Sequence, residues 1–340
     1  MKFKLLLSAI GFSVLSFAQT TNANLTNKAG STYTFTTVKN LEATGVQDQG
    51  RTGTCWSFSS MSFFESELIR IGKGKDYNLS EMYVVRMSYP LKAEKYIRLH
   101  GKSQFAEGGE FHDALNVLRN YGMVPEEVYN GKKLAADKYN HHYLDSVMLS
   151  IVTSAVKDDK LVDLDYLKKI NAKLDEILGP VPTEFEWKGK KYTPQSYAKE
   201  MGLNPDDYTM FSSFTHHPFY KKFVIEIPDN WASEQVMNVQ LDEMMNLIDN
   251  SITNGYGVSW AADVSEPGFK FKEGLALLPE KSMASMTPEE QKQMFVAPVA
   301  QQKVTQENRQ AAFDNYETQD DHAMHITGIV KDQNGKKYYI

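Results

Sequence analysis

The residue of this 340-residue chain that is best placed for covalent chemistry is its single cysteine. Cys55 lies in the segment QDQGRTGTCWSF (47–58), after Gly50 and Gly53, and an apolar helical pattern begins with it. The first turn of a helix offers unpaired N–H groups and a positive dipole end, and both favour a thiolate. Gln49 can place its side-chain amide beside the backbone N–H of Cys55, and two such donors can stabilise an oxyanion. The pattern therefore predicts a nucleophile, with a small buried apolar cysteine as the alternative.

A nucleophilic thiol needs a base, and we expect His322 to supply it. His322 follows Asp320 and Asp321 and opens the segment HAMHITGI, in which Met324 indicates that the chain borders a core. A neutral imidazole can accept the proton of a thiol and later return it to a leaving group. The sequence therefore predicts that folding brings His322 to Cys55.

The segment around the cysteine resembles the active-site segment of papain-like cysteine peptidases. The matching residues are Gln49, Gly50, Gly53, Cys55, Trp56, Phe58 and Ser59. The usual signature has a second cysteine three positions before the nucleophile, where this chain has Thr52. That departure suits the bleomycin hydrolase/aminopeptidase C branch, which looks like papain without its disulfides.

Three further segments resemble that branch. LSEMY (79–83) is similar to the helix after the cysteine helix, EGG (107–109) to the glycine segment that pairs with bound peptide, and DDHAMHITGI (320–329) to the segment of the catalytic histidine. The resemblance implies that Cys55 and His322 are catalytic and that Gln49 contributes to the oxyanion hole. It implies substrate-binding roles for the residues Gly108, Gly109, Glu110 and Phe111.

The function that the resemblance implies is that of a cysteine-type peptidase acting as an aminopeptidase. Such an enzyme releases N-terminal residues from peptides through a thiolate–imidazolium pair and an acyl-enzyme. A papain-like endopeptidase and a non-catalytic binding protein of the same fold are the alternatives, the latter if the chain truly ends at Ile340. The family implies an asparagine that orients the histidine, and the branch implies a C-terminal arm. Both would follow Ile340, so we expect this chain to be a fragment of a longer protein. The branch also implies a ring-like homo-oligomer.

The N-terminus predicts export. Lys2 and Lys4 precede an apolar stretch (5–17), and Ser16-Phe17-Ala18 has the small-x-small form of a cleavage site, so residues 1–18 are expected to be a signal peptide. The mature protein would then be periplasmic or extracellular. No other stretch approaches the ~20 apolar residues of a membrane span. A net charge of −6 without a Lys/Arg-rich run gives no support for nucleic-acid binding.

The expected fold is α+β: a papain-like two-domain peptidase with a helical domain, a β-barrel-like domain, a catalytic cleft between them and a large insertion. The expected divisions are a signal peptide (1–18), a helical domain with the nucleophile (19–130), an insertion or subdomain (131–235) and a β-rich domain with the histidine (236–340).

Hydrophobic periodicity and caps predict the individual elements. Helices are expected near 55–71, 78–101, 111–121, 142–156, 161–178 and 241–256, strands near 33–46 and 257–264, and hairpins near 179–194 and 322–340. Pro90 is expected to break or restart the second helix, and Trp260 is expected to be a core residue.

Four histidines and one aspartate are further candidates for binding sites. His216 and His217 could suggest a metal, but neighbours on an extended segment point to opposite faces, and no carboxylate is near in sequence. We therefore expect no metal and no cofactor. His325 is expected to pack on its strand. His112 is expected to lie on a helix surface, with a place in the lining of the cleft as the alternative. Asp263 is expected in a plain turn, with contact to a substrate amine as the alternative.

Overall fold

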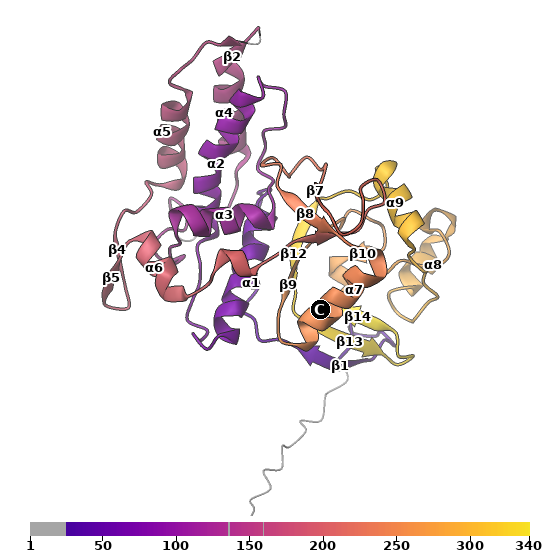
Figure 1. Cartoon of the computed structure of the whole chain (residues 1–340). Coiled ribbons are helices and arrows are strands. Elements are labelled where there is room, and N and C mark those ends of the chain that lie inside the picture. The colour runs from indigo at the N-terminus through magenta and orange to yellow at the C-terminus, as the bar shows by residue number, and fades with distance from the viewer. Residues whose placement is uncertain (1–24, 135–136, 159) are drawn as a thin grey trace, which may run out of the picture.

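The computed structural model describes residues 25–134, 137–158 and 160–340, so the predicted signal peptide (1–18) lies outside the described residues. Figure 1 shows a mainly helical lobe beside a β-rich lobe. No helix in the described ranges has both the length and the apolarity needed to cross a membrane.

Six helices and two short hairpins build the helical lobe within the described residues. The helices are α1 (Cys55–Arg70), α2 (Glu81–Arg98), α3 (Phe111–Tyr121), α4 (His142–Ala155), α5 (Tyr166–Leu178) and α6 (Pro194–Met201). The hairpins are β2 (Val156–Lys157) with β3 (Lys160–Leu161), and β4 (Phe185–Trp187) with β5 (Lys190–Tyr192). Local signals set several of these ends. The Ser80 hydroxyl caps α2 by accepting the Tyr83 N–H, and Thr193 caps α6 in the same way.

One hydrophobic core unites this lobe. Its buried side chains run from Trp56 to Met201, and α2 packs against both α4 and α5. The first part of the predicted insertion therefore shares a core with the helices that precede it. The boundaries predicted for the domains stay a prediction.

The expected break at Pro90 is wrong, because α2 runs through it without interruption. A proline inside a helix removes one backbone hydrogen bond and strains the preceding turn. In α2 the neighbouring Tyr89 and Ala93 are buried, so packing on the lobe's core compensates for that loss. Tertiary burial has overridden a local breaker.

The β-rich lobe is made of small open sheets. β1 (Phe35–Asn40), β13 (Gly328–Asp332) and β14 (Lys337–Tyr339) form an antiparallel sheet in the order β1-β13-β14. β9 (Val258–Ala262) pairs with β12 (His322–Ile326), placing Ala262 opposite His322. The predicted hairpin at 322–340 is thus confirmed only for β13 and β14. β12 joins a different sheet because Thr327, which lies between β12 and β13, instead donates its N–H to the Ile340 carbonyl at 2.7 Å.

The remaining elements cover this lobe and connect it to the helices. They are β6 (Phe211–Ser212), β7 (Lys222–Val224) and β8 (Gln235–Asn238) in one sheet, β10 (Phe269–Lys270) with β11 (Leu275–Ala276), and the helices α7 (Leu241–Thr253), α8 (Pro288–Gln293) and α9 (Gln306–Asp314).

Trp260 is not a core residue, since 40% of it is exposed. The reason is the register of the β9–β12 pair, in which Trp260 lies opposite Met324. His325 contacts Ser62 of α1, so its neighbour Met324 points to the opposite face of the sheet, and Trp260, as the cross-strand partner of Met324, shares that face. The sheet therefore buries one face only, and Trp260 is on the other.

Candidate active site

The loop before α1 is held by close backbone contacts. Gly50 has a positive φ of 63°, and a Cβ there would lie 2.5 Å from the Tyr139 carbonyl oxygen. The Gly53 N–H donates to the Glu107 carboxylate at 2.7 Å. Only glycine satisfies both the backbone angle and the approach at Gly50. These contacts fix where Cys55 begins the helix.

The structure brings Cys55 and the segment of His322 together. The helix α1 packs along β12, and the backbone of Ala323 lies close enough to the Cys55 thiol to lower its pKa. His322 is the residue before Ala323 and the first of the strand. The helix that Cys55 begins and the strand that His322 opens therefore pack together across the contact between the two lobes, and the pairing of the two side chains stays a prediction.

Burial shifts the pKa values of both residues of this predicted pair. It raises the pKa of the Cys55 thiol, an effect that outweighs that of the Ala323 backbone. It also lowers the pKa of His322, although the charge of Asp321 acts in the opposite direction. Burial thus acts against the thiolate that the helix start favours, and the thiolate–imidazolium pair stays a prediction.

The Gln49 amide is folded onto the loop that precedes α1. Its Nε2 donates to the Thr52 carbonyl at 2.7 Å, and the Thr52 hydroxyl donates to the Gln49 carbonyl at 3.0 Å. This uses one of the two amide N–H bonds and holds the group in place. The contribution of Gln49 to an oxyanion hole stays a prediction.

The glycine segment beside Cys55 is clamped by a buried lysine. The Lys92 ammonium donates to the carbonyls of Ala106 and Glu107, each at 3.0 Å, and to that of Gly108. The Trp56 indole also donates to the Glu107 carbonyl, at 3.1 Å. Burial lowers the pKa of Lys92 to about 8, partly offset by surrounding carboxylates. The backbone expected to meet a substrate is therefore rigid.

The other predicted substrate-binding residues differ in their surroundings. A Cβ on Gly109 would lie 2.9 Å from the Trp56 ring, so no side chain fits there. Burial raises the pKa of Glu110, and its hydrogen bond with Asp320 adds to this effect. The ring of Phe111 meets that of Phe63 edge-on, with centroids 5.0 Å apart. Phe111 thus contributes to the helical core, and the substrate contacts of all four residues stay predictions.

Two residues near this site were missed by sequence reasoning. Lys92 could have been noticed, because it falls on the same helix face as the buried aromatic residues Tyr89 and Tyr96. Asp229 had no local signal, since it lies in the predicted insertion and reaches Gly108 only through folding.

The structure shows the surroundings of three further candidates: His112, His325 and Asp263. His112 is buried, not on a surface, because the loop around Trp231 packs on α3; burial lowers its pKa to about 4. His325 packs as expected, with Nδ1 3.0 Å from the Ser62 hydroxyl. The Asp263 carboxylate accepts backbone N–H groups from Ser265 and other loop residues, as expected of a turn residue.

His216 and His217 do not point apart, as the sequence suggested, because they lie in a turn rather than on a strand. Their Nε2 atoms are 3.2 and 2.8 Å from the carboxylate of Glu226, so three metal-type ligands converge. The Gln310 amide oxygen accepts the Thr215 N–H, which directs its nitrogen to Nδ1 of His216. His216 must then carry its proton on Nε2, where a metal would bind. The arrangement fits a hydrogen-bonded cluster better than a metal site.

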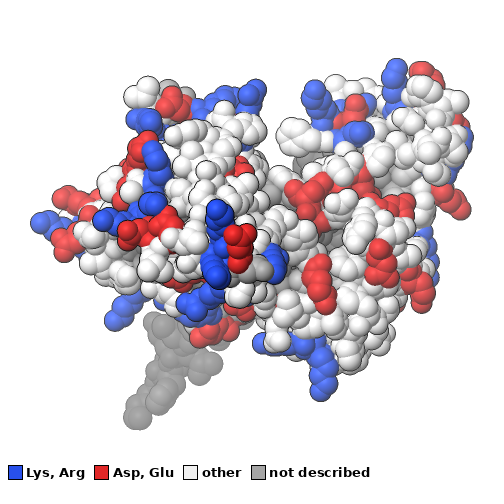
Figure 2. Space-filling model, turned by 90° about the horizontal axis from the view of Figure 1, so that it is seen from above, with Lys and Arg blue, Asp and Glu red and all other residues white. Residues whose placement is uncertain are grey.

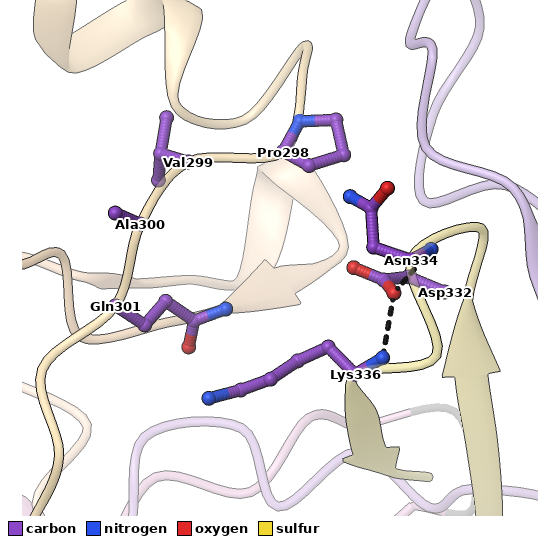
Figure 3. A pocket seen from close by; sticks show the side chains of 7 residues that line it. All are labelled: Pro298, Val299, Ala300, Gln301, Asp332, Asn334 and Lys336. Atoms are coloured by element: carbon purple, nitrogen blue, oxygen red, sulfur yellow. Dashed lines mark hydrogen bonds between the residues drawn. The ribbon is translucent and has the colours of Figure 1, made fainter.

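A separate hollow of about 340 Å³ lies at the turn between β13 and β14 (Figure 3). Its lining residues are Pro298, Val299, Ala300, Gln301, Asp332, Asn334 and Lys336. The Asp332 carboxylate accepts the backbone N–H groups of Asn334 and Lys336, so it is engaged in shaping the turn. None of these residues belongs to the elements around Cys55.

Comparisons with known proteins agree with this geometry. Residues 29–201 match the family described as papain family cysteine protease. Aminopeptidase C of Streptococcus thermophilus is 22% identical over 335 residues, which cover 86% of this chain and 72% of that protein. Aminopeptidase W of Lactobacillus delbrueckii subsp. lactis is 24% identical over 230 residues, covering 56% of this chain but only 52% of that protein. The chain thus spans about half the length of this second relative.

A solved structure shows the same fold. PepW from Lactobacillus rhamnosis HN001 superposes with a TM-score of 0.65 at 18% identity, over 89% of this chain and 74% of that one. The expected papain-like α+β fold is therefore confirmed, although the described strands form open sheets and no closed barrel. With the family match covering just over half of its residues, the chain belongs to the papain family of cysteine proteases.

Proposed function

We propose that the protein is a cysteine peptidase that removes N-terminal residues from peptides. The observation that carries the proposal is the packing of α1 along β12, because it joins the helix that Cys55 begins to the strand that His322 opens. Similarity to proteins named aminopeptidases supports the exopeptidase part of the proposal.

In the proposed reaction His322 accepts the thiol proton while Cys55 attacks the carbonyl carbon of the first peptide bond. The backbone N–H of Cys55 and the second amide N–H of Gln49 stabilise the oxyanion. The imidazolium then protonates the leaving amine, and a water molecule, deprotonated by His322, releases the acyl group from sulfur. Gly108 and Gly109 hold the substrate backbone.

The test compares a fluorogenic aminoacyl amide that has a free amine with its N-acetyl counterpart, using the full chain. We expect cleavage of the free-amine substrate, and a loss on the order of 10⁴-fold or more in Cys55→Ala and His322→Ala. Since Cys55 is the only cysteine, an epoxysuccinyl inhibitor can alkylate no other thiol, and mass spectrometry reports its addition. Cleavage of the blocked substrate alone would favour an endopeptidase, and absence of both alkylation and cleavage would favour a binding protein.

We also propose that residues 1–18 direct export and that the mature protein begins at Gln19. The support is the order of two lysines, an apolar stretch and small residues at the cleavage position. N-terminal mass spectrometry of protein from a secreting host tests this, and retention of residues 1–18 in the cytoplasm would contradict it. The ring-like homo-oligomer stays a prediction, which sedimentation of the full chain can test.

A further inference from the structure

We propose that Asp229 binds the free α-ammonium group of the peptide's N-terminal residue and so limits the site to exopeptidase action. This inference rests on the proposed peptidase function. It assigns a specificity-determining role to a residue of the predicted insertion, outside all the motifs that surround Cys55.

The position of Asp229 is the first argument. A Cβ on Gly108 would lie 2.1 Å from Oδ1 of Asp229 and 2.2 Å from Oδ2, so the carboxyl group rests directly against Gly108. It is also close enough to Cys55 for its charge to raise the pKa of the thiol. A peptide that continued along the glycine segment past Gly108 would collide with this group. A peptide that ended there would present its terminal ammonium to it.

The charge of Asp229 is the second argument. Burial raises its pKa to about 6, which leaves it ionised at neutral pH. Glu110 and Asp320 are the other carboxyl groups nearby, and they share a hydrogen bond with each other while burial raises the pKa of both. That pair can hold a proton between its members. Asp229 therefore remains the carboxylate able to bind a cation.

The carboxylate of Asp229 can also accept further hydrogen bonds. Among the described residues its one hydrogen-bond donor is the Gln104 amide, at a long 3.4 Å from Oδ1. The Lys92 ammonium lies nearby but is committed to three backbone carbonyls. An ammonium group placed over Gly108 would make a charge-assisted hydrogen bond in partly desolvated surroundings, where such bonds are strongest.

The loop that carries Asp229 is held in place, so the carboxylate is preorganised. The Asn230 amide donates to the carbonyls of Ile225 and Glu234, at 3.0 and 2.9 Å. The Trp231 indole donates to the Asp113 carboxylate at 2.9 Å, which docks the loop on α3. Figure 2 shows acidic side chains gathered beside the notch between the two lobes.

The test is Asp229→Asn in the full chain, which keeps the size of the side chain and removes its charge. We expect kcat/KM for a free-amine aminoacyl amide to fall at least tenfold. For the same substrate with hydrogen in place of the amine, kcat/KM should change less than twofold. Asp206→Asn is the matched control, because Asp206 belongs to the same predicted insertion but is exposed and pairs with Arg119 at 2.8 Å. The Asp206→Asn substitution should leave kcat/KM for both substrates unchanged.

Equal changes for both substrates, or no change for either, would overturn the proposal. Failure of the proposed function is recognised separately, because then the unaltered chain cleaves neither substrate and its thiol resists alkylation. Binding to Cys55→Ala, measured calorimetrically, covers the case of slow turnover. A free-amine dipeptide should bind at least tenfold more tightly than its N-acetyl form, and Asp229→Asn should abolish that preference. Equal binding of both peptides would also overturn the proposal.

Discussion

Lys92→Met gives the sharpest test of how the helical lobe positions the substrate segment. Lys92 is buried, and its ammonium donates to the carbonyls of Ala106, Glu107 and Gly108. Methionine retains the apolar stem and the helix propensity of lysine but removes the donors. The variant thus separates the packing of α2 from the clamp that its side chain provides.

The loss of stability expected for Lys92→Met follows from the hydrogen bonds that the three carbonyls keep. The Glu107 carbonyl keeps the Trp56 indole as a donor, whereas the carbonyls of Ala106 and Gly108 have no second donor among the described residues. A buried acceptor left unpaired costs ~1–3 kcal/mol, so two cost ~2–6 kcal/mol. Removing a buried charge recovers part of its desolvation penalty. We therefore expect the free energy of unfolding to fall by about 2–4 kcal/mol.

Urea unfolding followed by tryptophan fluorescence measures the loss of stability, and kcat/KM for the free-amine substrate measures the loss of positioning. Activity should fall at least tenfold under conditions where Lys92→Met is still folded. Lys95→Met is the control, since Lys95 is on the same helix and reaches only the Ala232 carbonyl at 3.4 Å. It should cost less than about 0.5 kcal/mol. Equal effects of the two substitutions would refute the clamp.

Two further substitutions probe the same lobe. Gly109→Ala places a Cβ 2.9 Å from the Trp56 ring. We therefore expect kcat/KM for the free-amine substrate to fall at least tenfold and the free energy of unfolding to fall by ~1–3 kcal/mol. Unchanged kcat/KM would show that the Trp56 ring moves to accommodate the methyl group. Burial and the nearby Glu126 raise the pKa of Glu81, so the folded chain holds a proton that the unfolded chain has lost. This contribution to stability is complete below the ordinary pKa of Glu81 and is lost as pH rises towards the raised value. Between pH 5 and pH 8 the unfolding free energy should therefore fall by ~1 kcal/mol or more less in Glu81→Gln than in the unaltered chain. Urea titrations at both pH values measure this, and an equal fall in the two proteins would contradict it.

Local chemistry explains what could be predicted without coordinates. The helix that begins at Cys55 was foreseen because its glycines and apolar spacing act over a few residues, and the helix after Ser80 because its cap is local too. The resemblance around Cys55 and His322 led to the correct family, since these motifs are short and contiguous in the chain.

Tertiary structure decided whatever depends on groups far apart in sequence. Burial raises the pKa of the Cys55 thiol, and the strand that carries His322 packs against the helix that Cys55 begins. Only folding brings Asp229 to Gly108, because the loop that carries it has no motif and is aimed by its docking on α3. The sequence by itself determined which residue is the nucleophile candidate. The packing of the two lobes decided how far the thiol is buried and which carboxylate lies against the substrate segment, because burial and contact act through space and not along the chain.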